Sequence, residues 1–116
     1  MTKDGADFTN TFANLNTPTA RDQILNRDAF DAWAARWHLR KSDEAAIIMA
    51  RANPQIIPRN HRVEEVINAG RNGDYAPFRA LLDAVTQPYA PLTESPAPFA
   101  RAPSKDEQVT RTFCGT

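Results

Sequence analysis

The placement of the nine prolines limits where this chain can form helices. Proline lacks a backbone N–H and disfavours helical geometry in the residue before it, so a helix tolerates it only in the first turn. Pro54 and Pro88 therefore end helices, whereas Pro77 falls in a first turn. Five of the nine prolines lie between residues 88 and 103. The sequence thus predicts a helical middle and a tail that cannot build a core of its own.

Apolar side chains between the prolines have helical spacing. In three stretches they recur at i, i+3, i+4 and i+7, which places them on one face of an α-helix, and a fourth stretch is a shorter apolar run. We expect the last two helices to be antiparallel neighbours joined by a tight turn. The predicted helices cover residues 28–40, residues 43–52 capped by Ser42 or Asp43, a segment from the cap Asn60 to Gly73, and a segment from the cap Asp74 to Pro88.

Outside these helices the sequence predicts three kinds of segment. Thr17 followed by Pro18 is typical of a helix N-terminus, so short helices are expected in the opening segment. Residues 53–61 hold two prolines and predict an ordered, extended connection. The proline-rich stretch after residue 87 is typical of a semi-rigid spacer or a strap laid over another surface.

The predicted fold class is therefore all-α. We expect four or five short helices in a small bundle with a proline-rich, largely disordered C-terminal tail, whose order would depend on a partner. The predicted organisation is a lead-in over 1–27, a helical core over 28–87 and a tail over 88–116 that ends in a cysteine motif.

The charge balance argues against two classes of partner. The chain has 14 Lys and Arg residues and 14 Asp and Glu residues, so it has no strong positive field for phosphate backbones or anionic lipid head groups. No run approaches the roughly 20 apolar residues of a membrane-spanning helix, and the N-terminus lacks the apolar stretch of a signal peptide. We expect no nucleic-acid or membrane partner and a cytoplasmic location.

Few side chains in this sequence could carry chemistry. The single cysteine and the two histidines, which are 23 positions apart at His38 and His61, have no metal-ligand spacing. Neither Ser nor Cys stands near His61, and no glycine-rich phosphate loop is present. The sequence predicts no catalytic residue, no metal and no cofactor in this chain.

Three aromatic residues form the first candidate site. Phe30, Trp33 and Trp37 share one face of the predicted helix 28–40. We favour an interpretation as domain core, since large aromatic side chains are mostly buried. The alternative is an anchor for a partner, because Trp is enriched at interface hot spots. His38 beside them is expected at the surface.

The second candidate site is the cluster Arg59, Asn60, His61 and Arg62, the densest group of hydrogen-bond donors in the chain. At a helix N-terminus it could hold an anion or a carboxylate. The favoured interpretation is local: Asn60 caps the helix, Arg62 pairs with Glu64 or Glu65, and His61 binds a loop carbonyl.

The third candidate is Cys114, third from the end of the chain. A thiol in a tail without an apolar surround is accessible, and accessible thiols exchange disulfides or oxidise. The alternative is an incidental thiol, because no nearby Lys or His clearly lowers its pKa.

One block of the sequence resembles a signature of the selenoprotein O family. It runs from Asn53 to Asp74 and contains Ile57-Pro58-Arg59-Asn60-His61-Arg62-Val63-Glu64. The segments before it, Asp7-Phe8-Thr9 and the Trp33/Trp37 helix, are similar to the family as well. The same holds, in the same order, for Pro77-Phe78, Leu81-Leu82, Pro88-Tyr89 and the closing Thr112-Phe113-Cys114-Gly115-Thr116.

The resemblance implies a pseudokinase-like parent protein that transfers AMP from ATP to hydroxyl side chains of other proteins with magnesium. The catalytic and nucleotide-binding residues of that core belong upstream of this region, so none is assigned here. ATP and magnesium are implied for the parent, with its kinase-like core and protein substrates as partners. The family places selenocysteine or cysteine third from the end, which implies a redox role for Cys114.

We therefore expect a C-terminal helical region that supports or redox-regulates a kinase-like core and is not catalytic by itself. The alternative is a free-standing helical module that binds an unrelated protein through the aromatic face and the Arg59–Arg62 cluster. A third interpretation is a small thiol enzyme that uses Cys114.

Overall fold

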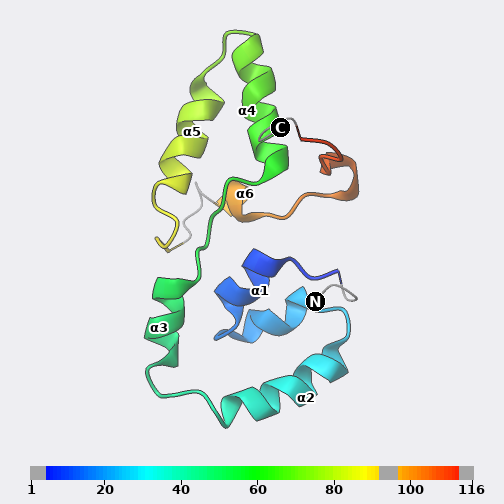
Figure 1. The fold of residues 1–116 in the computed structure, drawn as a ribbon, viewed down its shortest axis with the longest axis vertical. Helices are drawn as coiled ribbons and strands as arrows, with labels where there is room; N and C mark the ends of the chain where they lie inside the picture. Colours follow the sequence, from blue (N-terminus) through cyan, green and yellow to red (C-terminus); the bar gives the residue numbers. More distant parts are fainter. Residues whose placement is uncertain (1–4, 92–96, 113–116) are drawn as a thin grey trace. The chain divides into compact units, whose positions relative to one another are not determined.

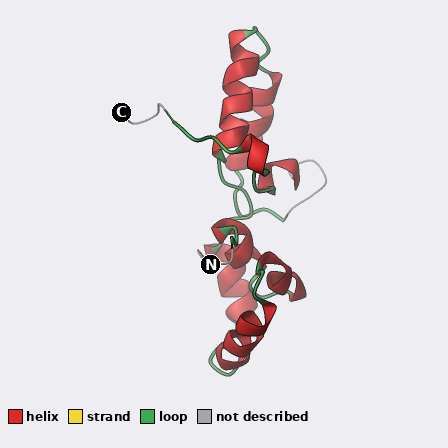
Figure 2. Ribbon diagram, turned by 90° about the vertical axis from the view of Figure 1, so that its right-hand side faces the viewer, coloured by secondary structure: helices red, strands yellow, loops and turns green. Residues whose placement is uncertain are grey.

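The chain folds into helices joined by loops. The computed structural model describes residues 5–91 and 97–112. Six α-helices and two short 3-10 helices lie within these ranges, and no strand does (Figures 1 and 2). The predicted all-α fold class is confirmed.

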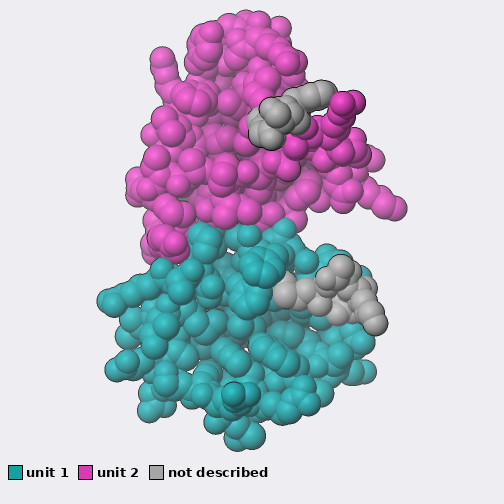
Figure 3. Space-filling model, viewed as in Figure 1, with its two compact units in different colours: residues 1–55 teal, residues 56–116 magenta. Residues whose placement is uncertain are grey.

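The helices gather into two compact units, unit 1 over residues 1–55 and unit 2 over residues 56–116 (Figure 3). This division by contacts differs from the division by composition at residues 27 and 87. The physical reason is that the helix over residues 27–38 lies against the opening segment, with which it shares unit 1.

Unit 1 contains α1 (Phe8–Asn14), the 3-10 helix η2 (Pro18–Gln23), α2 (Arg27–His38) and α3 (Ala45–Ala52). Side chains cap two of these helices. Asp7 accepts a hydrogen bond from the backbone N–H of Asn10 (2.8 Å), and Asn26 accepts one from Ala29 (3.1 Å). Pro18 opens η2 as predicted. η2 contacts both α1 and α2, so it holds the unit together.

The start of α3 differs from the prediction. Its N-cap residue is Glu44, and no described side chain caps the helix, so the prediction that Ser42 or Asp43 caps it is wrong. The backbone forms the turn instead, because the N–H of Ala45 donates to the carbonyl of Ser42 (3.1 Å). The other end matches the prediction, since Asn53 is extended (φ −106°, ψ 111°) before a proline.

Unit 2 is built on a hairpin of α4 (Asn60–Arg71) and α5 (Ala76–Val85), which run antiparallel as predicted (Figure 1). Both helices begin and end within about two residues of the predicted limits. The two helices contact each other along the hairpin, and Leu81 is the buried residue of α5.

The turn between α4 and α5 follows the Schellman pattern. Gly73 lies in the left-handed region (φ 84°) that glycine adopts without steric cost. Its N–H donates to the carbonyl of Gly70, and the N–H of Asp74 donates to the carbonyl of Ala69, each at 3.0 Å. The Asp74 carboxylate accepts a hydrogen bond from the N–H of Ala76 (3.0 Å), but the N-cap residue of α5 is Tyr75, so the prediction that Asp74 caps this helix is wrong.

The described part of the tail, residues 97–112, contains two short turns, α6 (Ala97–Ala100) and η3 (Lys105–Glu107). The sequence predicts a largely disordered tail, whereas this part has a defined path beside α4 (Figure 1). The physical reason is a set of polar contacts and one buried side chain, Ala100 at 8% exposure, which composition does not reveal.

Few apolar side chains of the described residues are buried: Ala20, Ile24, Ile56, Leu81 and Ala100. Many larger apolar side chains remain exposed: Phe8, Leu25, Trp33, Leu39, Ile47, Ile48, Ile67, Tyr75, Phe78, Leu82 and Tyr89. Exposed apolar faces of this extent are typical of surfaces that bind another protein surface. None of the helices in the described ranges has the length and apolar content needed to cross a membrane.

Candidate functional site

The aromatic face of α2, formed by Phe30, Trp33 and Trp37, lies at the surface of unit 1. Successive ring centroids are 5.8 Å apart, and the two indoles stack with their planes 12° apart. The ammonium group of Lys41 lies 5.1 Å from the Trp37 ring, a cation–π arrangement. Within the described residues α2 contributes none that is buried, and Trp33 is 39% exposed. Phe30 and Trp37 are half-buried, so the choice between domain core and an anchor for a partner stays a prediction.

A cavity of about 380 Å³ lies between α1 and α2 and includes Phe30 and Trp33 in its lining. Its described lining contains no charged residue and consists of Thr11, Phe12, Leu15, Ile24, Asn26, Ala29, Phe30 and Trp33. An ion pair joins η2 to α2: Nε of Arg21 lies 2.8 Å from Oδ1 of Asp31. The hydrogen bond from Arg21 lowers the pKa of Asp31 below its ordinary value. The cavity has the shape and lining to accept an apolar side chain.

The cluster Arg59 to Arg62 lies at the N-terminus of α4, as predicted. Arg59 is the N-cap residue and Asn60 is the first helical residue, so the prediction that Asn60 caps this helix is wrong. The physical reason is that the chain enters the helix one residue earlier than the pattern indicates. Arg62 donates through Nη1 to Oε2 of Glu65 (2.8 Å), and this predicted ion pair is confirmed.

His61 is buried, with 5% of its surface exposed. Neither ring nitrogen has a hydrogen-bond partner within the described part of the chain, so the prediction that His61 binds a loop carbonyl is wrong. Burial lowers the pKa of His61 below its ordinary value, and the nearby charge of Arg62 acts in the same direction. The ring is therefore mostly neutral at neutral pH.

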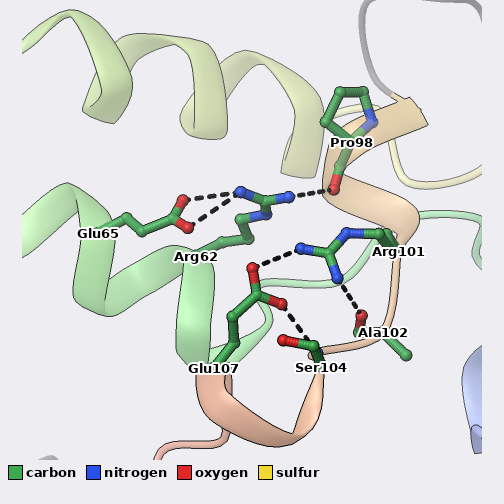
Figure 4. A network of polar contacts seen from close by, with 7 residues as sticks. All are labelled: Arg62, Glu65, Pro98, Arg101, Ala102, Ser104 and Glu107. Carbon is green, nitrogen blue, oxygen red and sulfur yellow. Dashed lines mark hydrogen bonds and ion pairs between the residues drawn. The ribbon is translucent and has the colours of Figure 1, made fainter.

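Residues 97–112, which we call the strap, contact the N-terminal turn of α4 (Figure 4). The guanidinium of Arg62 points between two partners: Nη1 binds Glu65, and Nη2 donates to the carbonyl oxygen of Pro98 (3.0 Å). One side chain thus ties the strap to α4.

A second group of contacts shapes the strap itself. Nη2 of Arg101 lies 2.6 Å from Oε1 of Glu107, and Nη1 of Arg101 donates to the carbonyl of Ala102 (3.1 Å). Oε2 of Glu107 accepts the backbone N–H of Ser104 (2.8 Å), and these two residues form a capping box around η3 (Figure 4). Hydrogen bonds and an ion pair between residues of the strap therefore hold its turn around η3.

Sequence reasoning missed the strap contacts, although one signal for them is present. Ser104 and Glu107 have the Ser-x-x-Glu spacing of a capping box, which predicts a helical turn even in a proline-rich segment. The contact between Arg62 and Pro98 spans 36 positions, and nothing in the sequence indicates it.

The pKa of Glu107 provides a direct test of these strap contacts. The hydrogen bond from Arg101 lowers this pKa to about 2, with further bonds from Ser104. We expect Arg101→Ala to raise the pKa of Glu107 toward the ordinary value of 4.5. Carbon-detected NMR of the carboxyl group during a pH titration measures it, with Lys105→Ala as the control. A pKa near 2 in Arg101→Ala contradicts the observed ion pair.

The lowered pKa of Glu107 determines how its contribution to the stability of the fold depends on pH. A carboxyl group with a lower pKa in the folded chain stabilises the fold above its unfolded pKa of about 4.5. This contribution disappears as the pH falls toward about 2. The ion pair between Arg101 and Glu107 is therefore intact throughout the neutral and mildly acidic range.

The structure brings the predicted residues together in two places. The aromatic face belongs to unit 1 and the Arg59–Arg62 cluster to unit 2, whereas Cys114 lies outside the described residues. In the described ranges no group of three or more His, Cys, Asp or Glu side chains could hold a metal ion.

Comparison with known proteins identifies relatives along the whole chain. The chain is 51% identical to the protein nucleotidyltransferases YdiU of Roseobacter denitrificans and Ruegeria sp. strain TM1040, of which it covers 24% and 25%. It is 40% identical to that of Bradyrhizobium diazoefficiens and covers 26% of it. Every one of these alignments includes 100% of this chain.

The chain thus spans about a quarter of the length of the curated relatives it matches, and that quarter is C-terminal. Neither a family model nor a solved structure matches the chain. Over its whole length the chain is therefore homologous to the C-terminal quarter of the YdiU protein nucleotidyltransferases, the selenoprotein O family, in agreement with the signature around Arg59 to Arg62.

Proposed function

We propose that this chain is the C-terminal, non-catalytic part of a protein nucleotidyltransferase and that it supports the kinase-like core of that parent. The observation that carries the proposal is the 51% identity between all of this chain and about a quarter of a YdiU protein. The parent would transfer AMP from ATP to hydroxyl side chains of proteins with magnesium, the activity that the resemblance implies. The kinase-like core is then the first partner of this chain.

The exposed apolar surface of α5 supports a packing role. Tyr75, Phe78 and Leu82, which we call the α5 face, stand at i, i+3 and i+7 and are 59%, 50% and 46% exposed. An apolar stripe of this kind gains free energy when another surface covers it. A parent about four times as long as this chain contains enough additional protein to cover it.

ATP, magnesium and protein substrates belong to the parent in this proposal. No step of the transfer is assigned to side chains of this chain. A cytoplasmic location stays a prediction of the sequence.

Labelling with ATP tests the proposal. We expect the isolated chain, incubated with magnesium, labelled ATP and candidate proteins, to transfer no label, whereas the parent labels its substrates. Removal of this region should reduce the labelling by the parent, because the core loses the surface that supports it. Label transferred by the isolated chain after repurification contradicts the non-catalytic role, and full activity of the truncated parent contradicts the supporting role.

We further propose that Cys114 is a regulatory thiol of the parent, as the family resemblance implies. The chain has no second cysteine, so oxidised glutathione should convert the isolated chain only to glutathione adducts or disulfide dimers. In the parent, mild oxidation should link Cys114 to a cysteine of the core and change AMP transfer. Mass mapping of the cross-linked peptides measures this.

The matched variant for the thiol is Cys114→Ser. If that variant responds to oxidant and reductant as the wild type does, and no peptide is cross-linked through Cys114, the thiol is incidental.

The exposed aromatic face of α2 favours a second candidate, a free-standing helical module that binds another protein. The Arg59–Arg62 cluster would be its second contact surface. The reading frame upstream of Met1 distinguishes the two functions: several hundred further codons support the fragment, and a ribosome-binding site at Met1 supports the module.

A further inference from the structure

The helix α3 of unit 1 exposes its largest apolar side chains. All eight of its residues are described, and none of them is buried. Ile47 and Ile48 are 58% and 55% exposed, whereas Ala45 and Met49, one turn apart on a different face, are half-buried. A helix at the surface of a globular protein usually turns its larger apolar side chains toward the core. The two isoleucines therefore lie on a face that the described part of unit 1 leaves open to solvent.

Two charged residues flank this pair along the helix. Glu44 and Arg51 lie one turn before and one turn after the isoleucines on the same face, and both are exposed. The helix dipole stabilises an acidic residue at the N-terminal end and a basic residue in the last turn. The face thus has two apolar side chains between two hydrated ends, as in an interface with an apolar centre and a polar rim. We call Glu44, Ile47, Ile48 and Arg51 the α3 face.

α3 has few features that stabilise a helix by itself. It has eight residues, and isolated helices shorter than about 12 to 15 residues are marginal in water. Its N-cap residue, Glu44, makes no side-chain capping bond, and the β-branched Ile47 and Ile48 lower the helix propensity. In the isolated chain α3 should therefore open at a small cost in free energy, and a cover over the isoleucines should stabilise it.

The small size of the α3 face indicates which kind of surface covers it. An eight-residue helix is about 12 Å long. Stable interfaces between separate molecules bury roughly 1,200 to 2,000 Å², and two isoleucines on so short a helix do not supply that area. A surface in the same polypeptide needs far less, because the covalent connection lowers the entropy lost on association. The YdiU relatives extend for about three quarters of their length upstream of the region that matches this chain.

We propose that the α3 face docks in an apolar groove on the upstream, kinase-like part of the parent. The inference rests on the proposed function, because it takes the covering surface from the same parent polypeptide. In the docked state Ile47 and Ile48 contact the apolar floor of the groove, and Glu44 and Arg51 stay hydrated at its rim. This docking surface is separate from the α5 face, which belongs to unit 2.

Hydrogen exchange followed by mass spectrometry, on the 116-residue chain and on the intact parent, tests the inference. The measured quantity is the exchange protection of peptides within residues 44–53. We expect this protection to be about 10- to 100-fold higher in the parent, because covering two half-exposed isoleucines stabilises α3 by about that factor. Equal protection in the chain and in the parent overturns the inference.

Two neighbouring substitutions form a matched pair. Ile47→Asp places a carboxylate on the α3 face, and Ala46→Asp places one at an exposed position on the other side of the helix. Both positions lie in the first turn of α3, where the helix dipole acts on them alike. In the parent, Ile47→Asp should reduce the protection of α3 to the level of the isolated chain, and Ala46→Asp should leave it high. Equal effects of the two substitutions contradict docking through this face.

The same measurements distinguish this inference from the proposed function and from self-association. Protection of α3 that rises with the concentration of the isolated chain assigns the face to a second copy and overturns the inference. Equal protection of α3, combined with weaker labelling by the truncated parent, overturns the inference and leaves the supporting role intact. Full labelling by the truncated parent contradicts the supporting role, and higher protection of α3 in the parent then still supports docking.

Discussion

Replacing Leu81 by alanine should reduce the free energy of unfolding of unit 2 by about 2 to 5 kcal/mol, the range for truncation of a buried leucine. Leu81 is 7% exposed and is the buried residue of α5. The change removes the buried apolar contacts of this side chain and leaves a cavity that its neighbours fill only in part. Urea unfolding followed by circular dichroism measures the loss.

The neighbouring residue provides the control for this prediction. Leu82 is 46% exposed, so Leu82→Ala should cost less than about 1 kcal/mol in the isolated chain. Equal losses in the two variants contradict the orientation of α5 on α4. Because the core of unit 2 is small, complete unfolding of Leu81→Ala with a stable Leu82→Ala agrees with the prediction.

Binding to the remainder of the parent protein, in contrast to stability, should depend on the exposed residues of α5. The double variant Phe78→Asp, Leu82→Asp should weaken that binding at least about 100-fold. Phe78 and Leu82 are about half exposed, so covering both contributes about 1.5 to 3 kcal/mol in total. Burying two unpaired carboxylates in their place costs several kcal/mol more, and the sum exceeds the roughly 2.8 kcal/mol that corresponds to a factor of 100. Titration of this chain into the separately produced upstream part, followed by calorimetry, measures the dissociation constant.

The control for the binding experiment is Arg79→Ala, an exposed residue of α5 outside the α5 face. It should bind as the wild type does. The circular dichroism of the double variant should also be unchanged, since Phe78 and Leu82 are exposed in the isolated chain. Wild-type affinity in a folded double variant excludes the α5 face as the docking surface.

The helix limits were largely predictable because they depend on the backbone of adjacent residues. Pro54 stops α3, Pro18 opens η2, and Gly73 adopts the left-handed geometry that ends α4. Each residue acts through its own dihedral angles or its missing N–H, so its effect needs no distant partner. The same locality explains why the ion pair between Arg62 and Glu65, one helical turn apart, was predictable.

The caps and the candidate sites were less predictable. Asn60 is of a residue type that often caps helices, but the path of the preceding loop makes Arg59 the N-cap residue. His61 has the chemistry to bind a loop carbonyl, yet its ring is enclosed without a partner among the described residues. Such outcomes depend on how the chain approaches the helix, and composition does not specify that path.

The sequence by itself determined the helical class, the limits of the main helices, the turn at Gly73 and, through its signature, the similarity to the YdiU protein nucleotidyltransferases. The tertiary structure alone decided that Leu81 is buried beside an exposed Leu82, that Trp33 is exposed, and that Arg62 binds the carbonyl of Pro98. The physical reason is that these outcomes depend on contacts between residues that are far apart in the sequence. Helical spacing places both leucines on one broad face, and only the position of α4 decides which side chain loses contact with water.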